Sequence, residues 1–202
     1  MPDWDKKYAA RQTPFGDLPN QYVRQILARS DFEAHTALCL ADGDGRNGTW
    51  LARQGITVTS VDISQVATEK ARERDRAAGV SVERITADLA VWVPPPGKWQ
   101  AVFVIYLQSE PAVRARALRL GADHLQPGGW LVVEGFGKPV AGRPDFGPDD
   151  ASVLYDLEEV EAAVPDLTVI EAFAGRTRLD EGGRHQGEAE VVRFAARKVE
   201  TA

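Results

Sequence analysis

The sequence predicts an α/β protein in which helices cover both faces of a mostly parallel, doubly wound sheet. From residue 36 to residue 136, apolar strand-like runs alternate with helical segments, which implies right-handed crossovers between parallel strands. The last two strand-like runs, 167–175 and 188–198, have no helical segment between them, which predicts an antiparallel hairpin at the edge of the sheet. With 202 residues, of which 44% are hydrophobic, we expect one domain, residues 1–202.

The N-terminal segment is expected to form two helices ahead of the sheet. Trp4 and Tyr8 are four residues apart, so a short helix would present both rings on one face. After a loop with proline and glycine, an apolar stripe marks a second helix over residues 21–30. Residues 1–33 are therefore interpreted as a helical lid.

Residues 34–137 are expected to form the first five strands and to hold a cofactor. "TALCL" is a short buried strand, and a glycine-rich turn then leads into a helix that ends at Gly55. "ITVTSVD" is rich in β-branched residues, and Ser64 is placed to cap the helix that closes at Gly79. Further strands are expected within 80–89, 101–107 and 129–136, with a helix from Pro111 to Gln126 between the last two.

Residues 138–202 are expected to form the substrate side of the domain. The loop 138–150 is long enough to act as a lid, and a short helix is expected over residues 156–163. "RTRLDEGGRHQG" separates the two strands of the hairpin, which places His185 in its turn.

Composition excludes several functions. The net charge of -6 would repel a nucleic acid, and no apolar run approaches the ~20 residues of a membrane helix. The start of the chain lacks the features of a signal peptide, so we expect a cytoplasmic protein with no nucleic-acid or membrane partner. Cys39 lies in an apolar run and the three histidines lack zinc-ligand spacing, so no metal is expected. The oligomeric state is left open.

A glycine pattern lies between the first two expected strands. Residues 43–48 spell G-x-G-x-x-G, and Asp62 ends the second strand, as in a Rossmann-like turn that binds a dinucleotide. The same loop carries Asp42 and Asp44, whose carboxylates would repel a diphosphate in a partly buried cleft. The loop is therefore predicted to suit a cationic ligand such as S-adenosylmethionine, whose ribose still needs an acid.

Asp62 fits a nicotinamide cofactor equally well, but Asp88 favours S-adenosylmethionine. Asp88 follows the third strand, where its carboxylate can accept a hydrogen bond from an adenine amino group. Hydride transfer lacks a Tyr-x-x-x-Lys pair and a histidine with an evident acid partner. Methyl transfer is the main hypothesis; a non-catalytic sensor of S-adenosylmethionine and an NAD(P)-dependent oxidoreductase remain alternatives.

Four stretches carry a family resemblance: "ALCLADGDGRNGTWLARQGITVTSVDIS", "ITADL", "QPGGWLVVEGF" and "LDEGGRHQGEAEVVRFAARK". Together they resemble a class I S-adenosylmethionine-dependent methyltransferase of the tellurite-resistance type, from about Trp4 to Lys198. The resemblance implies a seven-stranded sheet whose last strand is antiparallel. It implies that the cofactor is bound by Ala41, Asp42, Gly43, Gly45, Arg46, Asn47, Asp62, Ile63, Asp88, Leu89 and Ile105.

The sequence departs from the family pattern at two positions. Cys39 stands where the family usually has an acid, and Ala41 stands where it usually has its first glycine. Asp42 is the candidate to replace the missing acid. For Gly43 and Gly45 we expect close approach of the cofactor, because a Cβ atom would push the ligand away.

The acceptor side is less determined. Trp4, Tyr8 and Phe15 either seal the N-terminal helix onto the sheet or close over the cofactor and contact its acceptor. The resemblance places a histidine-bearing turn beside the acceptor, which makes His185 and Arg184 candidates to hold it. A soft anion such as a thiolate or a chalcogen oxyanion needs no base.

A neutral hydroxyl or amine would instead need a general base, and His185 or Tyr106 is the best candidate. Arg176 and Arg178 are either further contacts for an anionic acceptor or exposed charges at a strand end. The partner is thus expected to be a small-molecule methyl acceptor.

Overall fold

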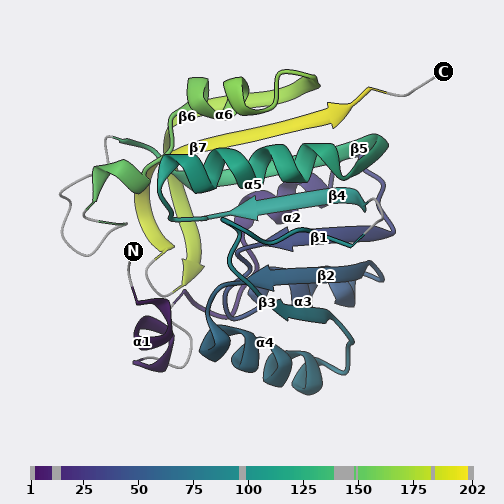
Figure 1. Ribbon diagram of the computed structural model, residues 1–202, viewed down its shortest axis with the longest axis vertical. Coiled ribbons are helices and arrows are strands. Elements are labelled where there is room, and N and C mark those ends of the chain that lie inside the picture. Colours follow the sequence, from purple (N-terminus) through teal and green to yellow (C-terminus); the bar gives the residue numbers. More distant parts are fainter. Residues whose placement is uncertain are drawn as a thin grey trace.

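The protein is described by a computed structural model that covers residues 3–10, 15–95, 99–138, 148, 150–182 and 185–199. Its seven-stranded sheet has the order β3-β2-β1-β4-β5-β7-β6 (Figure 1). The strands are β1 (Thr36–Leu40), β2 (Thr57–Asp62), β3 (Glu83–Thr86), β4 (Trp99–Ile105), β5 (Leu125–Phe136), β6 (Leu167–Gly182) and β7 (His185–Lys198). The first five are parallel, and β7 runs antiparallel to both β5 and β6. This confirms the predicted fold and its C-terminal hairpin.

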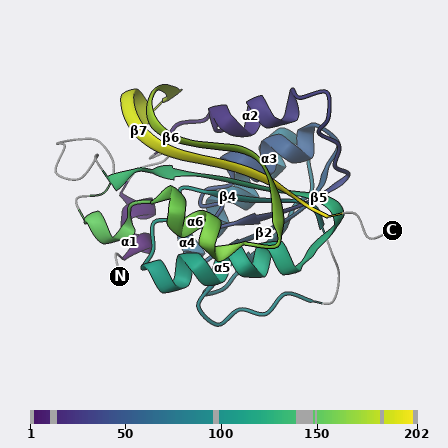
Figure 2. The same cartoon turned by 90° about the horizontal axis from the view of Figure 1, so that it is seen from above.

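Helices cover both faces of the sheet. They are α1 (Trp4–Ala9), α2 (Gln21–Leu27), α3 (Arg46–Arg53), α4 (Gln65–Ala78), α5 (Pro111–Asp123) and α6 (Leu157–Ala163), with a 3-10 turn η2 (Ala151–Val153). Figure 2 shows α2 and α3 on one side and α5 and α6 on the other. The central strands are apolar on both faces, so that Cys39 and Phe103 pack under α2 and α3, and Leu38 and Val104 pack under α5 and α6.

Local sequence signals set the helix ends. Asn20 caps α2 by accepting from the Val23 amide at 2.9 Å, and Ser64 caps α4 by accepting from the Ala67 amide at 3.0 Å. Gly79 ends α4 in the left-handed region, with φ of 67°. The helix expected over residues 21–30 is shorter than predicted and ends at Leu27.

The hairpin differs from the prediction in length. β6 and β7 extend to Gly182 and His185, so His185 is the first residue of a strand rather than part of a long turn, and it is buried. Its side chain is buried because the rings of Phe15, Tyr106 and Phe136 pack around it, where this end of the hairpin bends past the carboxyl ends of the parallel strands (Figure 1). Most of the predicted lid loop, 138–150, lies outside the described residues.

None of the helices in the described ranges is long and apolar enough to cross a membrane.

Candidate active site

A pocket lies where the direction of chain winding reverses. β1 and β4 are neighbours, but the chain continues from β1 to β2 on one side and from β4 to β5 on the other, and such switch points are common ligand sites. The residues that follow these strands, Ala41 and Tyr106, have left-handed φ angles of 58° and 54°. This conformation costs about 1–2 kcal/mol for a residue with a Cβ atom, and such strain is concentrated at functional sites.

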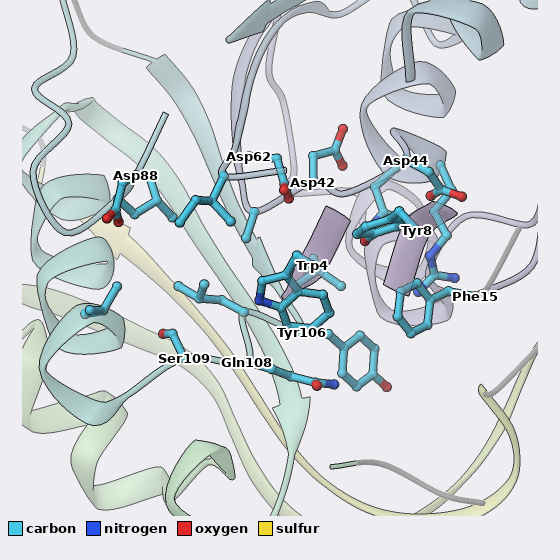
Figure 3. A pocket seen from close by; sticks show the side chains of 18 of the residues that line it. Trp4, Tyr8, Phe15, Asp42, Asp44, Asp62, Asp88, Tyr106, Gln108 and Ser109 are labelled. Carbon is cyan, nitrogen blue, oxygen red and sulfur yellow. The ribbon is translucent and has the colours of Figure 1, made fainter. Parts of the chain in front are cut away.

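The pocket encloses about 860 Å³, including the space open to solvent. Figure 3 shows Asp88, Asp62, Asp42 and Asp44 one after another along its upper edge, with Gln108 and Ser109 on the lower edge. Most predicted site residues line it: Ala41, Asp42, Arg46, Asn47, Asp62, Ile63, Asp88, Leu89, Ile105, Trp4, Tyr8, Phe15, Tyr106 and His185. Arg184 lies outside the described residues.

Asp62 and Asp88 supply negative charge that no cation in the described chain neutralises. The Asp62 carboxylate accepts from the amides of Gly43 and Ser64, each at 2.8 Å, and burial raises its pKa to about 6. Asp88 is half-buried and accepts from the Ala90 amide at 2.8 Å. Ile63 beside them is 41% exposed. Acids and an apolar surface at two neighbouring strand ends fit the ribose and the base of an adenosine.

Asp42 and Asp44 do not offer free charge to a ligand. The Asp42 carboxylate forms an ion pair with Arg84 at 2.5 Å, and its side chain is only 1% exposed. The Asp44 carboxylate pairs with Arg74 at 3.2 Å. Both residues line the pocket as predicted, but two arginines distant in sequence neutralise their carboxylates, so the prediction that they attract a cationic ligand by free charge has no support from this pairing.

Arg84 supports the glycine loop from beneath. Its guanidinium also bonds to Asp75 at 2.9 Å, Thr49 at 2.9 Å and Ser60 at 3.0 Å, while Asp42 accepts from the Gly48 amide at 3.2 Å. Asp42 thus fixes the loop to β3 and to the start of α3. In the sequence, the only signal for this role of Arg84 was its charge at a position of the short strand β3 that alternation turns inward.

The two glycines of the loop make room for protein atoms. A Cβ atom on Gly43 would collide with the Tyr8 hydroxyl, and one on Gly45 would lie 2.6 Å from Arg84 Nη2 and 2.7 Å from Ala71 Cβ. Both residues have positive φ angles, 59° and 81°. Glycine is therefore required here by the positive φ angles, by the Tyr8 ring of α1 and by the buried Arg84.

Aromatic rings close the pocket on the N-terminal side. The ring centroids of Trp4 and Tyr8 are 6.3 Å apart, those of Tyr8 and Phe15 are 5.9 Å apart, and those of Phe15 and His185 are 5.3 Å apart. Asp5 fastens α1 to the start of α4 by accepting from the Ser64 hydroxyl at 2.6 Å. The row of rings therefore joins the N-terminal helix to the hairpin.

His185 is the buried imidazole of the pocket. Its ring packs 4.2 Å from that of Tyr106, and its Nδ1 lies 3.2 Å from both Glu181 Oε2 and Arg46 Nη2. Burial lowers the pKa of His185, although Glu181 opposes that shift. Burial alone would raise the pKa of Glu181, but the hydrogen bond from His185 and the charge of Arg46 outweigh it and hold the pKa at about 2. The pair is thus a neutral imidazole beside an ionised carboxylate at neutral pH.

A second buried acid lies behind this group and was not predicted. Glu134 of β5 pairs with Arg193 of β7 at 2.5 Å, and Asn20 Nδ2 donates to Glu134 at 2.7 Å and to Glu181 at 2.8 Å. The Tyr106 hydroxyl is buried without a hydrogen-bond partner among the described residues. Burial raises the pKa of Tyr106, and the negative charge of Glu134 raises it further. The signal in the sequence was an isolated acid in "GWLVVEGF" and an isolated arginine in "VVRFAAR".

The remaining candidates divide by exposure. Arg176 is 69% exposed and pairs with Glu190 at 3.2 Å, and Arg178 is also exposed on β6, so neither is among the residues that line the pocket. Four lining residues were not predicted and lie just after β4 or at the start of α5: Leu107, Gln108, Ser109 and Val113. Their position at the carboxyl end of a central strand was the available signal.

The sequence is similar to a known family model and to a curated protein. Residues 37–129 match the family model described as a methyltransferase domain. The chain is 31% identical over 187 residues to trans-aconitate 2-methyltransferase of Paracidovorax citrulli (strain AAC00-1). The aligned region is 89% of this chain and 64% of that protein. The chain thus spans less than two thirds of this curated relative.

Solved structures with low sequence identity share the fold. TehB from Haemophilus influenzae superposes with a TM-score of 0.68 at 17% identity, covering 87% of this chain and 60% of that one. A S-adenosylmethionine-dependent methyltransferase from Methanosarcina mazei superposes with a TM-score of 0.69 at 16% identity, covering 91% and 100%. Residues 37–129 are thus similar to a methyltransferase domain, and the chain shares the fold of these solved structures.

Proposed function

We propose that this protein transfers a methyl group from S-adenosylmethionine to a small acceptor that carries a removable proton, such as a thiol or an amine. The observation that carries the proposal is the buried, neutral His185 ring at the pocket, held beside an ionised Glu181. A neutral imidazole is the side chain best suited to take a proton near pH 7.

The cofactor side of the pocket fits S-adenosylmethionine. Asp62 can accept from ribose hydroxyls in addition to its two backbone donors, and the exposed face of Ile63 offers an apolar surface for the adenine. Asp88 has acceptor capacity left for an adenine amino group. When bound, the cofactor supplies an electrophilic methyl group on a sulfonium.

The protein's own contribution is orientation, exclusion of water and removal of a proton. Trp4, Tyr8 and Phe15 form an apolar wall that keeps water from the reacting atoms. His185 would accept the proton of the acceptor as that atom becomes nucleophilic. Positioning of this kind supplies much of the rate enhancement in a displacement that needs no acid for its leaving group.

The charges of the lining favour a neutral or cationic acceptor over a multiply charged anion. Asp62 and Asp88 of the described lining have no cationic partner in the described chain, whereas Asp42 and Asp44 pair with Arg84 and Arg74, and Arg46 is already paired with Glu181 at 2.8 Å. This balance gives less support to a chalcogen oxyanion, or to a tricarboxylate of the kind named for the curated relative, than to a thiol or an amine.

Two measurements test the proposal. Calorimetry with S-adenosylmethionine, S-adenosylhomocysteine and NAD should show binding of the first two, and preferential binding of NAD would refute it. Transfer of a labelled methyl group should then be measured to thiols, amines, hydroxyl compounds, selenite, tellurite and trans-aconitate.

The proposal expects transfer to a protic acceptor and a loss of about 10²-fold or more in His185→Gln, with cofactor affinity unchanged within about twofold. Transfer to tellurite or to trans-aconitate that is unaffected by His185→Gln would overturn the assignment of a base. Binding without transfer to any compound would indicate a sensor.

A further inference from the structure

We propose that Glu181 is a positioning residue that fixes the tautomer of His185, with the proton on Nδ1 and the lone pair of Nε2 directed to the pocket. This inference rests on the proposed function, in which His185 accepts a proton from the methyl acceptor. Glu181 stands outside the residues that line the pocket, so it reaches the pocket only through the side chains of His185 and Arg46.

Two groups compete for the same ring nitrogen. Arg46 Nη2 and Glu181 Oε2 each lie 3.2 Å from His185 Nδ1. A guanidinium can only donate and a carboxylate can only accept, so the nitrogen satisfies one of them at a time. Donation from Arg46 would leave Nδ1 unprotonated, with its lone pair facing an anionic oxygen. Donation from Nδ1 to Glu181 avoids this repulsion.

Arg46 does not need the imidazole as a partner. Its Nη2 lies 2.8 Å from Glu181 Oε2 and its Nη1 donates to the Leu18 carbonyl at 3.0 Å. The contact with the carboxylate is both shorter and charge-assisted, so it is the stronger of the two contacts open to Nη2. The carboxylate therefore satisfies the guanidinium and the protonated Nδ1 together.

Glu181 is held so that it cannot turn away. Its second oxygen, Oε1, accepts from Asn20 Nδ2 at 2.8 Å and from the Gln21 amide at 2.9 Å, and its side chain has no exposed surface. Both oxygens thus face donors, which favours the ionised form in a buried position. The same carboxylate connects the hairpin to α2 and, through Arg46, to the cofactor loop.

The other ring nitrogen is left for the substrate. His185 Nε2 has no hydrogen-bond partner within the described parts of the chain, and His185 lines the pocket. The ring is held between those of Tyr106, at 4.2 Å, and Phe15, at 5.3 Å. A fixed ring with Nδ1 protonated presents an unprotonated Nε2, which is the form that a general base requires.

The tautomer can be observed directly by NMR on protein labelled with ¹⁵N-histidine, without any acceptor or cofactor. Long-range ¹H–¹⁵N correlation should show a pyrrole-type Nδ1 and a pyridine-type Nε2 for His185, assigned by the signal lost in His185→Gln. The opposite tautomer, or an imidazolium at pH 7.5, would overturn the inference in the wild-type protein itself.

The variant Glu181→Met removes the acceptor and leaves Arg46 as the polar neighbour of Nδ1. We expect the proton to move to Nε2, with Arg46 donating to Nδ1, and an unchanged tautomer in the folded variant would refute the role of Glu181. If the methionine variant does not fold, Glu181→Leu serves the same purpose. Asp180→Asn removes an exposed carboxylate from the next position and should leave the spectrum unchanged.

The readout separates the inference from the proposed function. A protein that transfers no methyl group but shows protonated Nδ1 in the wild type and its loss in Glu181→Met supports the inference and refutes the function. A protein that transfers methyl groups but carries the proton of His185 on Nε2 supports methyl transfer and refutes the inference about Glu181.

Discussion

Asp62 should make cofactor binding depend on pH. Its carboxylate has a pKa of about 6, raised by burial and by the neighbouring Asp42 and Asp44, and opposed by the amides of Gly43 and Ser64. Only the ionised form can accept from both ribose hydroxyls while keeping its two backbone hydrogen bonds. Because this acid has a raised pKa, it is protonated below about pH 6, so affinity must fall as the pH is lowered through that value.

The size of the effect follows from the pKa. With a value of about 6, the ionised fraction of Asp62 is about 0.1 at pH 5 and about 1 at pH 8. The Kd for S-adenosylmethionine should therefore rise about tenfold between pH 8 and pH 5, or about 1.4 kcal/mol. Isothermal titration calorimetry at several pH values measures this directly, and proton release on binding near pH 5, measured in buffers of different ionisation enthalpy, gives an independent check.

The variant Asp62→Asn is the matched control. It cannot ionise, so it should bind at least about tenfold more weakly at pH 8 and should lose the pH dependence that belongs to this residue. Any dependence that remains reports on the cofactor or on other groups. A wild-type Kd that is flat from pH 5 to pH 8, or a variant that binds as tightly as the wild type, would contradict the assignment of Asp62 to the ribose.

Three further predictions concern the loop and its support. Arg84→Met leaves the buried carboxylates of Asp42 and Asp75 without their cation, so the free energy of unfolding in urea should fall by about 3–5 kcal/mol, and a loss below about 1 kcal/mol would contradict the pairing. Ala41→Gly relieves the strain of a φ of 58° and should raise the free energy of unfolding by about 1 kcal/mol. Unfolding followed by circular dichroism measures this, and a lower free energy of unfolding in the variant would refute the strain. Gly45→Ala places a Cβ atom 2.6 Å from Arg84 Nη2 at a φ of 81°, so thermal unfolding should show a lower Tm together with weaker cofactor binding, and an unchanged Tm would contradict the crowding.

The sequence by itself determined the helices and strands, and it placed the site at the carboxyl ends of the parallel strands. Alternation of apolar runs with helical segments identified β1, β2, β4 and β5, because strands buried on both faces must be apolar throughout. Ser64 and Gly79 located the ends of α4, since capping depends on local backbone geometry. Strand ends in a parallel sheet share one edge, so Asp62 and Asp88 were placed correctly at the pocket.

Tertiary structure alone decided how the charges are paired. Asp42 meets Arg84 from 42 positions away, Arg46 meets Glu181 from 135 positions away, and Glu134 meets Arg193 through the register of β5 and β7. Sequence patterns report local periodicity, whereas an ion pair depends on which side chains the folded chain brings within about 4 Å. For that reason the pairing of Asp42 with Arg84 and of His185 with Glu181 became visible only in the folded chain.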